Sequence, residues 1–233
     1  MKRLMLLLPA LFAAFALALG ALASEGANAA GVLDGKIVCI DPGHGGSELG
    51  AVYQKKGRGG WELREKDVNL DVAFKLRELL EQRGATVAMT RTDDSTLSLQ
   101  ARVDICNNYR QAGKAPDILV SVHTNSTYTS RWDGSTTLMN KAIDRQLAEA
   151  LQPVIYSGLK SGWTGRFTDY GINVDTWYVP LHANMPAVIL EPVFMSNDAE
   201  ADALRYSIAQ APNGRRAQIS QVEFEGILAF FSP

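Results

Sequence analysis

The stretch that most constrains the fold is an apolar run that ends in a glycine-rich segment, in the sequence KIVCIDPGHGG of Lys36–Gly46. The run Ile37–Ile40 has the length and β-branched content of a buried strand. Pro42 and the glycines after it end the strand, because they favour turns and glycine adopts backbone conformations closed to other residues. Open α/β sheets bind ligands at the carboxyl ends of their strands, so His44 is predicted to lie on a tight loop at such an end.

Strand-like and helix-like segments alternate along much of the remaining chain. Apolar residues on one helical face, among them Val68, Val72 and Leu76, predict a helix that Glu65 opens and Gly84 ends. The alternation continues with helices predicted at 99–113 and 143–159 and with strands predicted at 85–90, 118–122 and 187–190. This order favours right-handed crossovers, so we expect a single α/β domain with a mostly parallel sheet and helices on both faces.

The segments between and after these elements have weaker patterns. Residues 45–64 are polar and rich in glycine, and they are predicted to form a surface loop. Further strands are expected at 135–139 and 177–181, irregular structure at 161–175, and helices at 198–206 and 219–231.

Length and charge restrict the partners of the chain. Its 233 residues suffice for one sizeable core, and 23 basic side chains nearly balance 25 acidic ones. This composition provides no electrostatic basis for binding nucleic acid or an anionic membrane surface.

The N-terminal residues have the pattern of an export signal. Lys2 and Arg3 precede the apolar residues 4–22, and small residues at 21–23 and 27–29 offer two cleavage sites. We therefore expect residues 1–29 to be a signal peptide with a short linker, and residues 30–233 to be a domain exported to the periplasm, the cell envelope or the medium. An uncleaved membrane anchor is the alternative, because the apolar run is long enough to span a bilayer.

The chain has two cysteines, Cys39 in the first predicted strand and Cys106 on the apolar face of a predicted helix. Export would permit a disulfide. Two free buried thiols are nevertheless favoured, because buried cysteine often behaves as a small hydrophobic residue. Nearby, Arg91, Asp93 and Arg102 are interpreted as a local ion-pair cluster with a structural role.

Four residues that can bind a metal or transfer a proton are predicted to meet. His44, His123 and Glu191 each come at the end of a predicted strand, and Glu65 begins the helix after the first of these strands. If the strands are parallel neighbours, all four side chains lie at one edge of the sheet. Considered alone, Glu65 is explained more simply as an acid that interacts favourably with the helix N-terminus. The convergence of four metal-binding or proton-transferring residues, however, is not explained by packing.

This set of residues suits zinc chemistry. Two neutral imidazoles and one carboxylate are common ligands of catalytic zinc, and they leave a fourth position for water or substrate. Zinc lowers the pKa of its bound water to roughly 7. A second carboxylate that is not a ligand can take the proton of this water and pass it to a leaving amine. Glu65 and Glu191 are the candidates for the two carboxylate roles.

Four motifs surround these residues in a fixed order: DPGHGG with His44, EKDVNL from Glu65, SVHTN with His123, and PAVILE ending at Glu191 and followed by FMSN at 194–197. Together they resemble the zinc-dependent N-acetylmuramoyl-L-alanine amidases of the amidase-3 family, enzymes that remodel bacterial cell walls. The similarity extends from about residue 36 to about residue 231, which is nearly the whole expected domain.

The resemblance implies a sheet of about six strands, zinc bound by His44, Glu65 and His123, and Glu191 as the catalytic carboxylate. The implied substrate is peptidoglycan, and the implied bond is the amide between the lactyl group of N-acetylmuramic acid and L-alanine of the stem peptide. Zinc would polarise this carbonyl, while Glu191 would activate water and then protonate the alanine nitrogen. An activating protein is a further candidate partner.

Some positions depart from the motifs or extend them. Val193 stands two residues after Glu191, where the family usually has glycine. His182 and Asn125 are candidates for substrate binding. A surface or core histidine is the alternative for His182, and a residue that braces the loop after His123 is the alternative for Asn125.

Two other functions compete with the amidase. One is a non-catalytic peptidoglycan-binding protein, although such proteins usually lack a metal ligand. The other is a zinc carboxypeptidase-like peptidase, which would need an arginine for the free carboxylate of its substrate. Arg131 and Arg166 are the candidates for that arginine.

Overall fold

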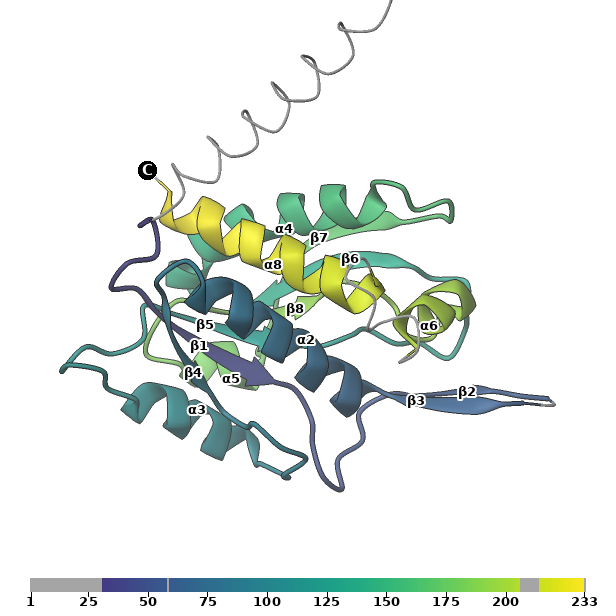
Figure 1. Ribbon diagram of the computed structural model, residues 1–233, viewed down its shortest axis with the longest axis horizontal. Helices are drawn as coiled ribbons and strands as arrows, with labels where there is room; N and C mark the ends of the chain where they lie inside the picture. The colour runs from purple at the N-terminus through teal and green to yellow at the C-terminus, as the bar shows by residue number, and fades with distance from the viewer. Residues whose placement is uncertain (1–30, 58, 206–213, 233) are drawn as a thin grey trace, which may run out of the picture.

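The computed structural model describes residues 31–57, 59–205 and 214–232. Its centre is a six-stranded sheet with the strand order β4-β1-β5-β8-β6-β7 (Figure 1). Neighbouring strands are parallel except for β6 and β8, which are antiparallel. The strands are β1 (Ile37–Pro42), β4 (Thr86–Met89), β5 (Ile118–Val122), β6 (Gly134–Met139), β7 (Thr168–Val174) and β8 (Ala187–Glu191). The predicted α/β class and the mostly parallel six-stranded sheet are confirmed.

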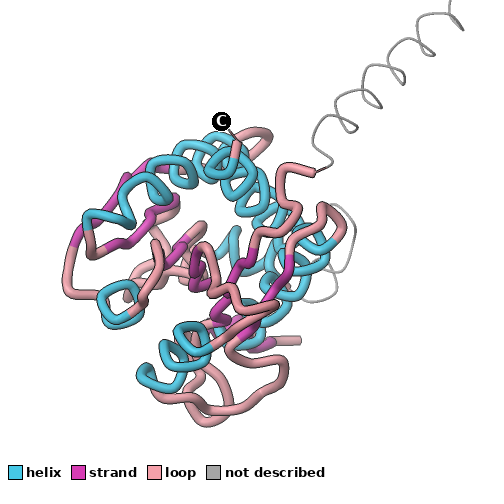
Figure 2. Tube along the Cα trace, turned by 90° about the vertical axis from the view of Figure 1, so that its left-hand side faces the viewer, coloured by secondary structure: helices cyan, strands magenta, loops and turns pink. Residues whose placement is uncertain are grey.

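Helices lie on both sides of the strands (Figure 2). Because side chains alternate along a strand, Val38 and Ile40 of β1 pack into one hydrophobic core and Cys39 packs into another. The first core also contains residues of α2 (Glu65–Glu81), α4 (Arg145–Lys160), α6 (Asp198–Leu204) and α8 (Arg215–Phe231), and the second contains residues of α3 (Leu99–Asn108) and α5 (Tyr178–His182). A short 3-10 helix, η1 (Ala142–Asp144), precedes α4.

The prediction of a surface loop at residues 45–64 is wrong in part. This segment contains an antiparallel hairpin of β2 (Val52–Lys55) and β3 (Trp61–Arg64), which extends away from the body of the protein (Figure 1). Gly57 and Gly59 have φ of 106° and 78°. These glycines therefore allow the turn between the two strands. In the sequence, the high glycine content instead indicates irregular structure.

Two other segments also differ from their predictions. Residues 178–182 form the short helix α5 instead of a strand, and Val179 of this helix is buried in the second core. Residues 168–174 form β7, where the sequence predicts irregular structure. This strand lies at the edge of the sheet and is largely exposed, so it lacks the apolar run of a central strand.

The prediction of two free thiols is wrong, because Cys39 and Cys106 form a disulfide. The bond joins β1 to α3, and both residues are completely buried. Their Cα atoms lie 5.8 Å apart, within the usual range for a bridge. The packing of α3 on β1 buries both side chains and also brings them together.

The predicted signal peptide and linker, residues 1–29, lie outside the described residues. Within the described part of the chain, every helix is too short or too polar to traverse a bilayer.

Candidate metal centre

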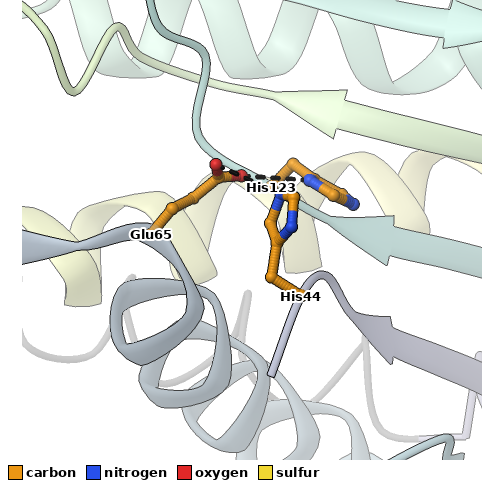
Figure 3. Close-up of side chains that lie close together, drawn as sticks. All are labelled: His44, Glu65 and His123. Carbon is orange, nitrogen blue, oxygen red and sulfur yellow. Dashed lines mark hydrogen bonds and ion pairs between the residues drawn. The ribbon is translucent and has the colours of Figure 1, made fainter. Parts of the chain in front are cut away.

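Three of the four predicted site residues meet at the carboxyl edge of the sheet (Figure 3). His44 follows β1, His123 follows β5, and Glu65 is the first residue of α2. One Glu65 oxygen, Oε2, lies 3.2 Å from His44 Nε2, and the other, Oε1, lies 3.0 Å from His123 Nδ1. The two imidazole rings meet edge to face with centroids 4.9 Å apart.

The buried carboxylate of Glu65 is held by several further donors. The backbone N–H of Ala51 donates to Oε2 at 2.8 Å, and the N–H of Thr124 and the side-chain amide of Asn69 donate to Oε1 at 3.3 and 3.2 Å. Burial by itself would raise the pKa of Glu65, but the hydrogen bonds and charges of His123 and His44 outweigh burial and hold this pKa well below its ordinary value. Glu65 is therefore ionised and fixed in orientation.

His123 and Glu65 stabilise each other electrostatically. Burial by itself would lower the pKa of His123, but the hydrogen bond and charge of Glu65 raise it to about 9. His44 has no comparable hydrogen bond at Nδ1. This atom is buried, and the nearest carboxylate oxygen, from Glu48, lies 3.6 Å away.

Two glycines leave room for the three side chains. A Cβ atom on Gly43 would lie 2.2 Å from the ring of His123, and a Cβ on Gly50 would lie 2.6 Å from both His44 and Glu65. Any side chain at either position would displace a site residue. His44 itself has φ of 60°, a left-handed conformation that is uncommon outside glycine and often occurs at functional sites.

A buried polar network supports the backbone before and at His44. Arg102 of α3 donates to Asp41 Oδ1 at 2.9 Å and to the carbonyls of Pro42 and His44 at 2.7 and 2.6 Å. Arg91 donates to the carbonyls of Pro42 and Gly43 at 3.0 and 2.9 Å. The predicted local cluster is correct in part: Arg91 donates to the backbone carbonyl of Asp93 at 2.9 Å. The ion pair of Arg102, however, is with Asp41, 61 residues away.

Glu191 ends β8 beside this group, opposite Thr136 of β6. Its Oε2 atom is buried and has no hydrogen-bond partner. Burial raises the pKa of Glu191 to about 8; the nearby His123 lowers it and the nearby Glu65 raises it. A carboxyl with a free, buried oxygen near His123 can accept or donate a proton there.

The donor atoms fit a divalent metal ion of the zinc type. One ligand atom from each of His44, Glu65 and His123 lies within 4.8 Å of the other two. Two imidazoles and one carboxylate are a usual donor set for catalytic zinc.

Asn125 and His182, the two predicted substrate-binding residues, make contacts of a different kind from those of the three clustered residues. Asn125 braces the loop, because its backbone exchanges hydrogen bonds with Val193 and Met195 and its side chain accepts from Ser126. His182 ends α5, stacks on Tyr178 with a centroid distance of 4.1 Å, and precedes the amino-terminal end of β8.

Sequence reasoning missed the contacts of Asn69, Gly50 and Arg102 at this site. Asn69 lies one helical turn after Glu65, and this i, i+4 spacing was a usable signal. Gly50 and Arg102 reach the site from segments with no motif of their own, so only the fold identifies them.

The fold and site thus define an α/β protein with a candidate metal centre at the carboxyl edge of its sheet. Residues 38–215 match the model of the family described as N-acetylmuramoyl-L-alanine amidase. The chain belongs to this family.

Relatives agree with this assignment. The N-acetylmuramoyl-L-alanine amidase LytC of Bacillus subtilis is 32% identical over 178 residues, which cover 75% of this chain but only 32% of LytC. The chain therefore corresponds to about a third of that relative. The germination-specific N-acetylmuramoyl-L-alanine amidase of the same organism is 29% identical over 216 residues, which cover 86% of this chain and 81% of the relative.

A solved structure has the same architecture. The CwlD amidase of Clostridioides difficile, determined in complex with the GerS lipoprotein, superposes with a TM-score of 0.67 at 26% identity. The match covers 84% of this chain and 98% of CwlD.

Proposed function

We propose that the protein is a zinc-dependent N-acetylmuramoyl-L-alanine amidase that acts on peptidoglycan. The observation that carries the proposal is the convergence of His44, Glu65 and His123 within 4.8 Å, beside Glu191, in a chain of this family. The bond cleaved is the amide between the lactyl group of N-acetylmuramic acid and L-alanine.

In this proposal His44, Glu65 and His123 hold the zinc ion. When bound, the ion supplies positive charge that polarises the amide carbonyl and acidifies water. The donors around Glu65 keep this ligand ionised and correctly oriented, as partners of metal ligands generally do. Asn69 and the N–H groups of Ala51 and Thr124 are these donors.

Glu191 is the proton carrier. It takes a proton from the water that attacks the carbonyl carbon, and it gives this proton to the alanine nitrogen as the C–N bond breaks. The products are the free lactyl carboxylic acid and a stem peptide with an N-terminal alanine. Glu191 suits this role better than Glu65, because both oxygens of Glu65 are engaged while Oε2 of Glu191 has no partner.

We further propose that residues 1–29 direct export and that residues 30–233 form the catalytic domain. The Cys39–Cys106 disulfide supports export, because such bonds persist mainly outside the cytoplasm. The complex of the relative CwlD with a lipoprotein supports a protein partner for this chain as well.

The test is hydrolysis of a purified muramoyl peptide with and without a chelator. We expect new N-terminal alanine to appear, to stop when metal is removed completely, and to return when zinc is added. Alanine release that persists without metal would contradict the proposal. Cleavage at a different amide would instead support the peptidase alternative, and binding without cleavage would support a non-catalytic protein.

The Glu191→Gln variant tests the proton carrier in the same assay. Losing a general base should reduce turnover at least about 10²-fold while bound zinc, measured by metal analysis, stays at the wild-type level. Glu62→Gln on the exposed strand β3 is the matched control and should keep full activity. Normal turnover of Glu191→Gln would assign the role to another residue.

A further inference from the structure

Three aromatic rings form a continuous cluster, defined here as the aromatic platform: Trp132, Tyr170 and Phe194. The ring centroids of Trp132 and Tyr170 lie 6.2 Å apart, and those of Tyr170 and Phe194 lie 5.5 Å apart. Phe194 is buried, whereas the side chains of Trp132 and Tyr170 are 47% and 37% exposed. Large aromatic groups are costly to leave in water, so this cluster calls for an explanation.

The platform lies at the same edge of the sheet as the candidate metal centre. Because β6 is antiparallel to β8, the start of β6 lies beside the end of β8, and Thr136 pairs with Glu191. Trp132 comes two residues before β6, and Phe194 comes three residues after Glu191. The backbone bridge between Asn125 and Phe194 ties the loop after His123 to the platform as well.

A bulge in β7 places Tyr170 beside this edge. Ser135 pairs with Asp169 and Thr137 pairs with Ile172, so Tyr170 and Gly171 together oppose Thr136. Thr136 fixes the bulge by donating to the carbonyl of Gly171 at 2.9 Å, and Gly171 has φ of 68°. Bulges of this kind often redirect side chains next to active sites. Thr136 is thus paired with Glu191 on one side and with the bulge that carries Tyr170 on the other.

We propose that the aromatic platform binds a sugar ring of the glycan strand next to the amide that is cleaved; this inference rests on the proposed function. One face of a hexopyranose presents C–H groups and is apolar, while its hydroxyl and acetamido groups lie at the rim. Exposed aromatic rings bordered by polar side chains match this pattern. Arg131, directly before Trp132, is an exposed polar residue next to the platform in the chain.

A cavity beside the loop that precedes Trp132 has a different lining. This cavity, of about 210 Å³, lies between β2, the loop of residues 126–130 and Met195 and Ser196. Hydroxyl groups dominate its lining, and its exposed aromatic side chain is the single Tyr128. The stacked, apolar surface that suits a sugar face is on the β6–β7 side. Tyr128 therefore offers a control of the same residue type at the same edge.

The test measures binding of peptide-free glycan, made of alternating N-acetylglucosamine and N-acetylmuramic acid, to the purified protein. This probe contains no scissile amide, so binding is independent of hydrolysis. We expect Trp132→Ala and Tyr170→Ala each to weaken binding about tenfold or more, while Tyr170→Phe and Tyr128→Ala stay within about twofold of wild type. Thermal melts check that the variants are folded. We expect them to be, because the side chains of Trp132 and Tyr170 are partly exposed.

A second measurement separates this inference from the proposed function. Cleavage of a muramoyl peptide by the wild-type protein tests the amidase itself, while binding of peptide-free glycan tests the platform. The inference is overturned if the wild-type protein does not bind peptide-free glycan, if both platform variants bind it normally, or if Tyr128→Ala weakens binding equally. Any of these results with intact cleavage would leave the amidase proposal standing.

Discussion

Among the described residues, two carboxyl groups are buried with oxygen atoms that lack a hydrogen-bond partner: Glu191 at the carboxyl edge of the sheet and Glu223 on α8. Glu191 interacts electrostatically with His123 and Glu65 of the candidate metal centre. Glu223 is completely buried, and neither of its oxygens has a partner. Burial of this kind disfavours the charged form and raises the pKa of Glu223 to about 8.

The Glu223→Gln variant should therefore change how stability depends on pH. The folded-state pKa of Glu223 exceeds its ordinary value of 4.5, so between pH 4.5 and 8 the folded protein keeps a proton that the unfolded chain releases. The free energy of unfolding of the wild type should fall across this interval by a few kcal/mol more than that of the variant. Urea unfolding of both metal-free proteins at pH 5 and pH 8 measures the difference, and equal pH dependence would contradict it.

At the level of elements, α3 holds the loop that carries His44. Cys106 attaches this helix to β1 by a disulfide, and Arg102 bonds to Asp41 and to the carbonyl of His44. The Arg102–Asp41 pair is almost completely buried, and the charge of Arg102 with the bonds from Thr90 and Ser121 outweighs burial and lowers the pKa of Asp41. The helix therefore holds the loop that carries the first candidate ligand.

Removing the disulfide should destabilise the protein without changing its fold. In the chain-entropy model, a bond between residues 67 positions apart contributes about 4 kcal/mol. We expect Cys39→Ala/Cys106→Ala to lose a comparable free energy of unfolding in non-reducing urea titrations. Reduction should lower the stability of the wild type but not that of the variant. A variant as stable as the oxidised wild type would show that the bridge contributes nothing.

In the whole molecule, the candidate metal centre connects three separate parts: the end of β1, the start of α2 and the end of β5. A ligand that binds the folded state alone stabilises it by mass action. Zinc bound by residues from three elements should for this reason stabilise the entire domain.

Zinc should thus raise the free energy of unfolding by about 4 kcal/mol when its concentration is 1,000 times the Kd. The measurement is urea unfolding with and without zinc. The His123→Ala variant should not respond to zinc, whereas His182→Ala, at the far end of β8, should respond like the wild type. An equal response of all three proteins would place the ion elsewhere.

Local pattern predicted the central elements well and the peripheral ones poorly. β1, β5 and β8 are buried on both faces, so their apolar runs were plain in the sequence. α5 and β7 lack such runs, because α5 has only five residues and β7 is an exposed edge strand. Their structure depends on what they pack against more than on their own residues.

The sequence by itself predicted that His44, His123 and Glu191 would lie at one edge of the sheet, with Glu65 beside them, if their strands were parallel neighbours. The carboxyl ends of adjacent parallel strands share one edge of a sheet, so the prediction required only that these strands be parallel neighbours, as β1, β5 and β8 are. Tertiary structure alone decided the Cys39–Cys106 bond, the Arg102–Asp41 pair and the aromatic platform. Each of these joins segments that are distant in the chain, and the distance between such segments depends on strand register and helix packing, which no local pattern encodes.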